Sequence, residues 1–345
     1  MNAAERAALV TRYTEEAVTE EEIADILAER DDPHAYIGYA PTGEMHIGHF
    51  TTMRKLADFL AADVEVTVLV ADLHAHLDDE KSPFELLDAR SDYYEAAIRG
   101  MIEAAGADPS DVNFVRGTEY QLEEPYTLDL YRLIADTTIS RAQRAGSEVV
   151  RQSDNPKLGG LVYTLMQSLD VAALDADIAY GGIDQRGIYM LAREALPGQG
   201  YDKPACVFAP LLSGLTGGKM SASDAGSKVN LTDSPEAVEE KIQGAYCPQG
   251  EVEDNGVLGY LKYLVFPVFD ERGEELVVER PDEYGGDLVY GDYDALEADY
   301  VSGELHPADL KPGAAAAISD VIDPVRERLN AEPELLAAAY PEKYD

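Results

Sequence analysis

Short apolar segments that end in a glycine-containing turn and lead into a helix recur along this chain, and this alternation narrows the possible folds more than any other feature. Residues 35–40 are mostly apolar and run into Pro41-Thr42-Gly43, a turn signal. The helix predicted next carries apolar residues near helical spacing, namely Ile47, Phe50, Met53, Leu56 and Leu60. Further strands are predicted at 64–70, 112–115, 178–180 and 206–211. The pattern predicts a Rossmann-like α/β fold with a doubly wound, mostly parallel sheet, whose ligands bind at the carboxyl ends of strands.

Some parts of the chain depart from this alternation. The first thirty residues read as helical, and residues 119–160 read as an inserted segment of helices. After residue 231 helices and loops replace the α/β pattern, with helices predicted at 235–246 and 314–329.

The length and this change of pattern predict the domain organisation. A chain of 345 residues favours two domains. We expect an α/β domain over residues 1–231, with a glycine-rich loop region at 212–231, and a mainly helical domain over 232–345.

Acidic residues far outnumber basic ones. The chain has 67 Asp and Glu against 27 Lys and Arg, a formal net charge of −40. Self-repulsion on that scale would weaken a compact state in dilute salt, whereas near 1 M salt the Debye length falls to about 3 Å. We therefore expect a protein adapted to a very salty cell interior. The window 132–157 reverses the trend, with five basic residues against three acidic ones.

Several protein classes can be excluded. No stretch approaches the roughly 18 apolar residues of a membrane span, and the first ten residues lack the basic and apolar regions of a leader. We expect a soluble, cytoplasmic protein without a membrane partner. Cys206 and Cys247 are too few for a disulfide framework and too isolated for a CxxC metal motif, so both are predicted to be packing residues.

The first chemical motif is PTGEMHIGH, at the turn and helix start over residues 41–49. A helix start presents free backbone N–H groups, and His46 and His49 lie three residues apart on one face, which suits a phosphate. Gly48 would let a flat ligand approach the backbone. The alternatives are two incidental histidines or a metal-binding pair. We predict no metal site, because no Cys or Glu at ligand spacing accompanies the pair.

The second motif is GGKMSAS, over residues 217–223. Two glycines before this run predict a mobile loop that can bring the Lys219 ammonium and the Ser221 and Ser223 hydroxyls onto phosphate oxygens. An ordinary surface loop would explain the same residues. Because the chain has only 10 lysines, one at this place favours a functional role.

A third motif is the predicted helix LVYTLMQSLD. Its residues Tyr163, Gln167 and Asp170 follow an i, i+4, i+7 spacing, which places a phenol, an amide and a carboxylate on one narrow stripe. A solvated face is the alternative, but it predicts charged residues rather than Tyr and Gln. The stripe therefore favours the wall of a binding pocket.

Together the first two motifs resemble the HIGH and KMSKS signatures of class I aminoacyl-tRNA synthetases. The stretches YIGYAPTGEMHIGH, ADLHAHL, LVYTLMQSLD, GGIDQR and ELHPADLK are similar to the archaeal and eukaryotic type of tyrosyl-tRNA synthetase. They follow in order from about Tyr36 to Leu329. The resemblance implies that 1–231 is the class I catalytic domain, with the KMSKS-like loop in 212–231, and that 232–345 binds the anticodon.

The resemblance implies L-tyrosine, ATP and tRNA(Tyr) as partners, with Mg²⁺ accompanying the ATP. The enzyme would form tyrosyl-AMP and pyrophosphate, and then transfer tyrosine to the 3′-terminal adenosine of the tRNA. Tyr36 and Asp170 would bind the phenolic hydroxyl of tyrosine. Its ammonium would be held by Tyr163, Gln167 and Gln185. The residues that would line the ring pocket are Leu69, His74, Tyr120, Gln121 and Leu174.

By the same resemblance, His46, His49, Lys219 and Ser221 would act as catalytic donors to phosphate oxygens. The residues expected to contact ATP are Gly43, His46, Gly48, His49, Lys219, Met220, Ser221 and Ser223. Two positions depart from the family pattern, because Ala222 stands in place of the usual second lysine and Asp224 follows in place of a basic residue. Either Lys219 suffices with a bound cation or Lys228 contributes.

For tRNA, the resemblance assigns Arg186 to the first base pair of the acceptor stem, and Tyr284, His306 and Asp309 to the anticodon. A buried Tyr, a surface His and a helix cap at Asp309 are the structural alternatives. The basic window within the inserted segment is a further candidate contact. The family also implies a homodimer joined through that segment.

Three other functions compete with this one. A tryptophanyl-tRNA synthetase shares the fold and both signatures but has no reason to place Asp170 and Tyr36 around a hydroxyl. A small nucleotidyltransferase with an HxGH loop does not account for the helical domain and HPADLK. A noncatalytic RNA-binding paralogue would not need His46, His49 and Lys219.

Overall fold

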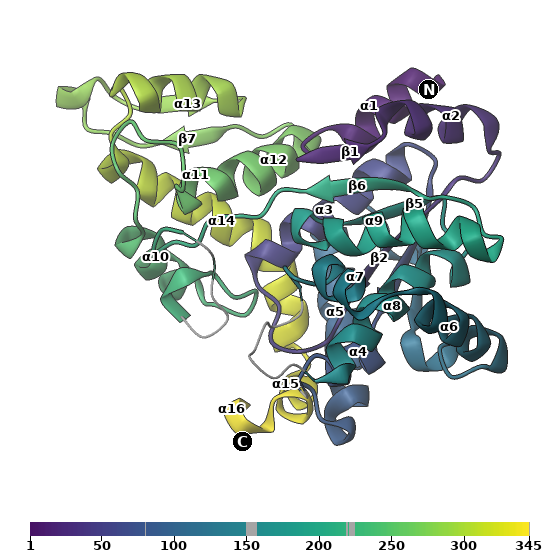
Figure 1. Cartoon of the computed structure of the whole chain (residues 1–345). Helices are drawn as coiled ribbons and strands as arrows, with labels where there is room; N and C mark the ends of the chain where they lie inside the picture. Colours follow the sequence, from purple (N-terminus) through teal and green to yellow (C-terminus); the bar gives the residue numbers. More distant parts are fainter. Residues whose placement is uncertain (80, 150–156, 219, 221–224, 345) are drawn as a thin grey trace.

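The computed structural model describes residues 1–79, 81–149, 157–218, 220 and 225–344. The described residues form a six-stranded sheet in the order β1-β6-β5-β2-β3-β4 (Figure 1). Its strands are β1 (Glu16–Val18), β2 (His34–Tyr39), β3 (Glu65–Val70), β4 (Val112–Arg116), β5 (Ile178–Gly182) and β6 (Ala205–Ala209). β2 to β6 are parallel, and β1 is antiparallel to β6. The predicted Rossmann-like α/β fold is thus confirmed.

The order of the strands reverses at β2. β3 and β4 extend the sheet on one side of β2, whereas β5 and β6 extend it on the other. In doubly wound sheets the crevice at such a reversal, outside the carboxyl ends of the strands, is where ligands bind. The fold therefore places a candidate site beside the ends of β2 and β5.

Nine α-helices lie before residue 231 among the described residues. They are α1 (Ala3–Thr11), α2 (Glu20–Glu29), α3 (Ile47–Ala61), α4 (Asp72–Leu77), α5 (Leu87–Ala104), α6 (Glu124–Asp136), α7 (Ile139–Ala145), α8 (Leu158–Ala173) and α9 (Arg186–Ala195). Thr19 begins α2 with a capping box, as its side chain accepts from the Glu22 N–H and Glu22 accepts in return. α6 and α7 lie within the segment 119–160 that was predicted to be an insertion of helices.

The part after residue 231 is mainly helical. Its helices are α10 (Pro235–Gly244), α11 (Gly256–Tyr260), α12 (Phe266–Arg272), α13 (Tyr293–Ser302), α14 (Pro307–Asn330), α15 (Pro333–Ala339) and α16 (Pro341–Tyr344). A small antiparallel hairpin, β7 (Leu276–Val278) and β8 (Leu288–Tyr290), adds a feature that the sequence did not predict. Among the described residues, no helix is both long and apolar enough to cross a membrane.

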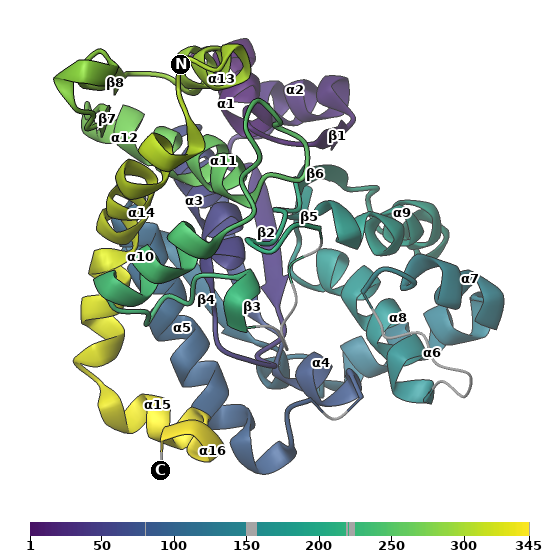
Figure 2. The same ribbon diagram turned by 90° about the vertical axis from the view of Figure 1, so that its left-hand side faces the viewer.

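Two clusters of buried apolar side chains form the core. The larger one runs from Val10 through α3 and β3 to Tyr340, and thus continues across the boundary expected at residue 231. In Figure 2, α14 and α15 lie along α5, and the contacts between these helices agree. The smaller cluster surrounds Tyr36, Leu69 and Leu169 on the other face of the sheet. The two-domain division stays a prediction, because the two parts share one continuous core.

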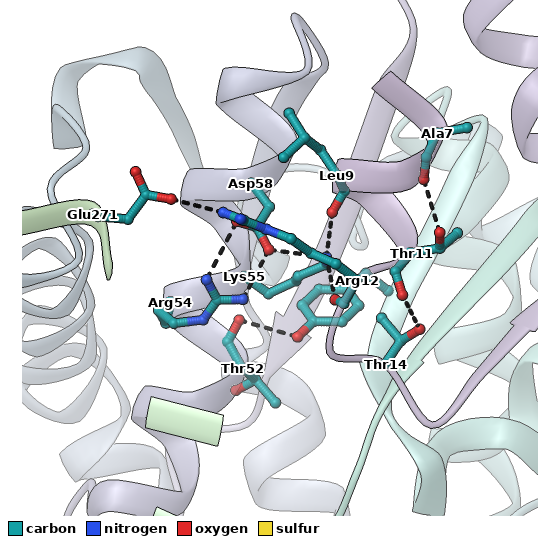
Figure 3. Close-up of polar contacts among 11 residues, drawn as sticks. Ala7, Leu9, Thr11, Arg12, Thr14, Thr52, Arg54, Lys55, Asp58 and Glu271 are labelled. Atoms are coloured by element: carbon teal, nitrogen blue, oxygen red, sulfur yellow. Dashed lines mark hydrogen bonds and ion pairs between the residues drawn. The ribbon is translucent and has the colours of Figure 1, made fainter. Parts of the chain in front are cut away.

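A group of charged side chains, which we call the α3 charge cluster, holds α1 and α12 against α3 (Figure 3). It consists of Arg12, Arg54, Lys55, Asp58 and Glu271. The Asp58 carboxylate is 1% exposed and lies 2.6 Å from Arg12, 2.8 Å from Arg54 and 3.0 Å from Lys55. Burial raises the pKa of Asp58, but the charges of Lys55 and Arg54 outweigh burial and lower this pKa to about 2. The buried acid is therefore ionised and compensated at neutral pH.

Candidate active site

A cavity of about 390 Å³ opens at the carboxyl ends of β2 and β5, where the strand order reverses. Its walls come from the end of β2 and the loop after it, from the start of α3, from Gly181 and Gly182 at the end of β5, and from Asp184 and Gln185 after it. Asp78, Tyr163, residues 210–212 and Met220 also line it. The cavity thus lies where ligands bind in doubly wound sheets.

His46 and His49 meet in this cavity at the start of α3. The Nδ1 atom of His46 accepts from the Gly48 N–H at 3.2 Å, and the Nδ1 atom of His49 accepts from the His46 N–H at 3.1 Å. Burial lowers the pKa of His49 to about 4, and burial together with the neighbouring His49 and Lys228 lowers that of His46. Both rings are therefore neutral at pH 7, and each carries its proton on Nε2 as a hydrogen-bond donor.

Gly48 leaves room above the first turn of α3. A Cβ atom at this position would lie 3.1 Å from the His46 ring and 3.4 Å from the Met220 sulfur. A side chain there would push against both neighbours, so glycine keeps the backbone accessible from the cavity. Gly43 differs, since a Cβ atom there would meet no described atom within 4 Å, and Gly43 is not among the residues that line the cavity.

A second group of polar side chains surrounds Asp170 on α8, which is fully buried. Its Oδ1 atom accepts three hydrogen bonds of 2.8 Å, from the hydroxyls of Tyr120 and Tyr126 and from the Gln121 amide. Burial raises the pKa of Asp170 to about 7, although these three hydrogen bonds act to lower it. The other oxygen, Oδ2, lies 3.5 Å from the Nε2 atom of His74. Burial lowers the pKa of His74 to about 4, so this ring is neutral at pH 7.

Several buried polar atoms in this group have no hydrogen-bond partner within the described part of the chain. They are Asp170 Oδ2, both ring nitrogens of His74, Gln121 Oε1 and Gln167 Oε1. A buried polar group without a partner costs about 1–3 kcal/mol. A polar ligand that pairs with these atoms would regain that free energy, so the group has the chemistry of a binding site.

Side chains that line the cavity connect it to the Asp170 group. Tyr163 lines the cavity and packs edge-on against His74, with ring centroids 4.7 Å apart. Gln185 also lines it and accepts from the Gln167 amide at 3.0 Å. The stripe predicted on LVYTLMQSLD thus faces inward, because Tyr163, Gln167 and Asp170 are all buried.

The remaining residues expected in the tyrosine pocket differ in how deeply they are buried. Tyr36 is buried and donates to the Gln167 carbonyl at 3.3 Å rather than to Asp170. Leu69 is buried on β3 within the smaller core cluster. Leu174 lies after the end of α8, is only partly buried and is not among the residues that line the cavity.

Sequence reasoning missed three polar residues of the site. Tyr126 on α6 donates to Asp170, and Asp78 and Asp184 line the cavity. Tyr126 comes from the inserted segment and carried no spacing signal toward Asp170. Asp184 stands in GGIDQR directly after β5, so its position after a strand was the signal that could have identified it.

Much of the second motif falls outside the residues that the structure describes. This applies to Lys219, Ser221, Ser223, Ala222 and Asp224. Met220 is described and lines the cavity close to Gly48. Lys228 is buried, and its charge helps to lower the pKa of His46.

The candidate tRNA contacts are not among the described residues that line this cavity. Arg186 is exposed and donates to Glu16 at 2.9 Å, and this hydrogen bond lowers the pKa of Glu16. Tyr284 is 65% exposed after β7, whereas His306 caps α14 and Asp309 lies in its first turn. Arg280 donates to the Glu304 carbonyl at 3.0 Å and thereby holds the β7–β8 hairpin beside the start of α14.

The basic window is largely neutralised by local acids. Arg132 pairs with Asp129 at 2.6 Å, Arg141 pairs with Glu194, and Lys157 pairs with Asp79 at 3.0 Å. Arg151 lies outside the described residues. The inserted segment 119–160 exposes large apolar side chains, namely Leu122, Leu128, Tyr131, Ile134, Ile139 and Leu158. These exposed apolar side chains make the inserted segment a candidate interaction surface.

Comparison with known proteins identifies the family to which the chain belongs. The family described as tRNA synthetases class I (W and Y) matches residues 28–323, most of the chain. The chain belongs to this class of synthetases. Within it the chain groups with the tyrosine–tRNA ligases of archaea and eukaryotes.

Individual relatives support that grouping. The chain is 76% identical over its full length to the tyrosine–tRNA ligase of Natronomonas pharaonis, and covers all of that protein. It is 74% identical to that of Haloarcula marismortui, with 100% of this chain and 99% of the relative covered. The crystal structure of the tyrosyl-tRNA synthetase of Archaeoglobus fulgidus complexed with L-tyrosine has a TM-score of 0.89 at 44% identity, covering 95% of this chain and 99% of that one. A tryptophanyl-tRNA synthetase from Giardia lamblia, at 19% identity and a TM-score of 0.70, shares the fold.

Proposed function

We propose that this protein is a tyrosine–tRNA ligase. It activates L-tyrosine with ATP to give tyrosyl-AMP and pyrophosphate, and then transfers the tyrosyl group to the 3′-terminal adenosine of tRNA(Tyr). The observation that carries the proposal is the buried Asp170, whose Oδ2 atom has no partner among the described residues, next to a cavity that begins at two neutral histidines. The identity of 76% to a tyrosine–tRNA ligase over the full length supports it.

The Asp170 group selects the phenol of the substrate. The hydroxyl of tyrosine donates to Asp170 Oδ2 and accepts from His74, whose ring nitrogens also lack a partner in the described part of the free protein, or from Tyr36. Phenylalanine would leave these buried groups unpaired, at a cost of about 1–3 kcal/mol for each. Leu69, Tyr120 and Gln121 surround the ring, and Leu174 contributes from the end of α8.

The ammonium and carboxylate of tyrosine point from this pocket into the cavity. Tyr163, Gln167 and Gln185 hold the ammonium, since the Gln167 Oε1 atom is buried and lacks a partner within the part of the chain that the structure describes. This orientation brings the carboxylate toward the start of α3. The substrate therefore spans both halves of the site.

ATP binds with its phosphates at the start of α3. The open backbone at Gly48 and the Nε2 protons of His46 and His49 face the nucleotide, and Gly43 supports the turn before them. Met220 packs against the same region, whereas Lys219, Ser221 and Ser223 supply further donors from the second motif. Neutral imidazoles donate hydrogen bonds without a buried positive charge, which fits the low pKa values of both rings.

Mg²⁺ accompanies ATP in this proposal. Within the described residues no three His, Cys, Asp or Glu side chains come together as a metal site. Mg²⁺ commonly keeps several waters and binds one or two carboxylates together with substrate phosphates. Asp78 and Asp184 are the carboxylates that line the cavity. Bound there, the ion would neutralise phosphate charge.

The chemical step needs alignment and charge stabilisation rather than a general base. The tyrosine carboxylate attacks the α-phosphorus, a phosphorus–oxygen bond to pyrophosphate breaks, and the leaving group carries the electron pair away. His46, His49, Lys219 and Ser221 stabilise the negative charge that develops on the phosphate oxygens.

We further propose that a homodimer forms through the exposed apolar face of residues 119–160 and acts in the cytoplasm. Arg186 contacts the acceptor stem, while Tyr284 stacks on an anticodon base, and His306 and Asp309 read base edges beside it. The hairpin and the start of α14 are held together by Arg280, which favours a shared surface for these three residues.

Amino-acid-dependent exchange of pyrophosphate into ATP tests the proposed function. The assay compares tyrosine, phenylalanine and tryptophan in molar KCl with the same enzyme. We expect exchange with tyrosine and a preference over phenylalanine of at least about tenfold, since 1.4 kcal/mol is a factor of ten. Faster exchange with tryptophan, or no exchange with any of the three, would exclude the proposal.

A further inference from the structure

The loop between β2 and α3 carries part of the proposed ATP site, and side chains of α5 hold its backbone. The Tyr94 hydroxyl donates to the Gly43 carbonyl at 2.7 Å, and the Tyr93 hydroxyl accepts from the Met45 N–H at 3.0 Å. Arg90 donates to the Thr42 carbonyl at 3.5 Å. The position of residues 42–45 therefore depends on where α5 places these three side chains.

A segment far along the chain packs behind the same three side chains. Residues 333–344, which we call the clamp segment, comprise α15, which packs against α5, and α16, which packs against α15 (Figure 2). Arg90 donates through Nε to the Ala339 carbonyl at 3.0 Å, and its guanidinium lies 5.1 Å from the centre of the Tyr340 ring. Tyr340 in turn meets Tyr93 edge-on at 5.2 Å. The clamp segment thus fixes the groups that hold the loop.

The clamp segment also contacts the loop directly. Lys343 forms an ion pair with the Glu44 carboxylate, and the Tyr344 hydroxyl donates to the same carboxylate. The Glu44 side chain is only 9% exposed, and a covered carboxylate is costly unless it is paired. Both contacts come from the clamp segment, so the loop and the clamp segment stabilise one another.

The charges of Lys343 and Glu44 affect Lys228, which in turn affects His46. Burial lowers the pKa of Lys228, Lys343 lowers it further, and Glu44 opposes that change. Lys228 in turn contributes to the lowered pKa of His46, after burial and His49. Glu44 therefore lies among the charges that set the environment of the proposed phosphate donor.

We propose that the clamp segment is a positioning element of the nucleotide site, which holds the loop 41–46 in the conformation that binds ATP. Lys343 and Tyr344 act through Glu44, and Arg90 acts through the Thr42 carbonyl. The inference rests on the proposed function. Its effect falls on ATP rather than on tyrosine, because Arg90, Lys343 and Tyr344 contact the loop and not the Asp170 group.

Steady-state pyrophosphate exchange with single variants tests this role. Glu44→Gln and Lys343→Met remove the ion pair, and Tyr344→Phe removes one hydroxyl while leaving the ring. We expect the KM for ATP to rise about threefold to tenfold in the first two, as a partly exposed charge-assisted contact is lost, with the KM for tyrosine unchanged. The double variant Glu44→Gln/Lys343→Met should be no worse than the single ones. Glu334→Gln, an exposed acid of the same segment, is the matched control and should leave both constants unchanged.

Amide hydrogen exchange of the full-length protein gives a readout that does not depend on activity. The N–H groups of Gly43 and Met45 should exchange faster in Lys343→Met and Tyr344→Phe than in the wild type and in Glu334→Gln. An unchanged KM for ATP with unchanged loop exchange, or equal increases in both KM values, would overturn the inference. If the wild-type protein showed no tyrosine-dependent pyrophosphate exchange, the proposed function would be wrong. Amide hydrogen exchange in the loop would then still decide whether the clamp segment positions it.

Discussion

Asp170→Asn should separate the stability of the buried site from its binding of tyrosine. Asparagine has the shape of aspartate, and its amide oxygen can accept the hydrogen bonds that Tyr120, Gln121 and Tyr126 donate. Its nitrogen would take the place of Oδ2, the atom without a partner. The substitution therefore removes a buried charge with little change in packing.

The expected change in the free energy of unfolding follows from the pKa of Asp170. Burial raises it from an ordinary value of 3.8 to about 7, and at about 1.36 kcal/mol per pKa unit this corresponds to about 4 kcal/mol. Because the pKa is higher in the folded state, the wild type loses that stability as the pH rises from about 4 to about 7. The variant has no such loss, so it should be more stable by up to about 4 kcal/mol near pH 8 and by little near pH 4.

Although Asp170→Asn should make the protein more stable, it should weaken the binding of tyrosine. The amide nitrogen at the position of Oδ2 cannot accept a proton from the phenol, and an unpaired buried donor costs about 1–3 kcal/mol, or about fivefold to 150-fold in Kd. Urea unfolding from about pH 5 to pH 8.5 in constant molar KCl and calorimetric titration with tyrosine measure the two effects. A variant that is less stable than the wild type at pH 8, or a difference that does not vary with pH, would refute the reasoning.

Three further predictions concern the charge cluster, the apolar face and tRNA. Asp58→Ala leaves Arg54 and Lys55 buried without their acid and should lower the free energy of unfolding in urea by about 3–5 kcal/mol. Since the pKa of Asp58 is lowered to about 2, its stabilisation should be present above about pH 4 and disappear as the pH falls toward 2, and a flat profile would contradict this. The wild type should have the mass of a dimer in light scattering, and Ile139→Asp on the exposed apolar face should have that of a monomer. A variant with the same mass as a dimeric wild type would exclude this face as the dimer contact. The affinity for tRNA should fall less steeply with KCl concentration than it does in a relative from a low-salt organism, because stacking on Tyr284 releases no counterions. Equal slopes of affinity against KCl concentration in the two proteins would count against this prediction.

Much of the fold could be predicted because its elements are long or strongly apolar. The strands at 64–70 and 112–115 and the helix beginning at Ile47 lie within a residue of their predicted bounds. β1 and the β7–β8 hairpin have strands of three residues, which are too short for an alternating pattern to stand out. The register that brings β1 beside β6 depends on contacts between residues far apart in sequence, so the local pattern could not predict it.

The candidate site could be predicted only in part. The stripe of Tyr163, Gln167 and Asp170 follows from helical spacing, and the turn before His46 follows from local residue preferences. Tyr126 reaches Asp170 across the fold, and no local pattern encodes such a contact. The raised pKa of Asp170 also depends on complete burial, which is a property of the folded state.

A crystal structure of the protein with L-tyrosine would show directly whether Asp170 binds the phenol. We expect the phenolic oxygen within about 3 Å of Asp170 Oδ2, the distance of a hydrogen bond, and the ammonium beside Tyr163 and Gln185. A ring bound elsewhere in the cavity, or a carboxyl of Asp170 that still lacks a partner in the complex, would exclude this role of Asp170.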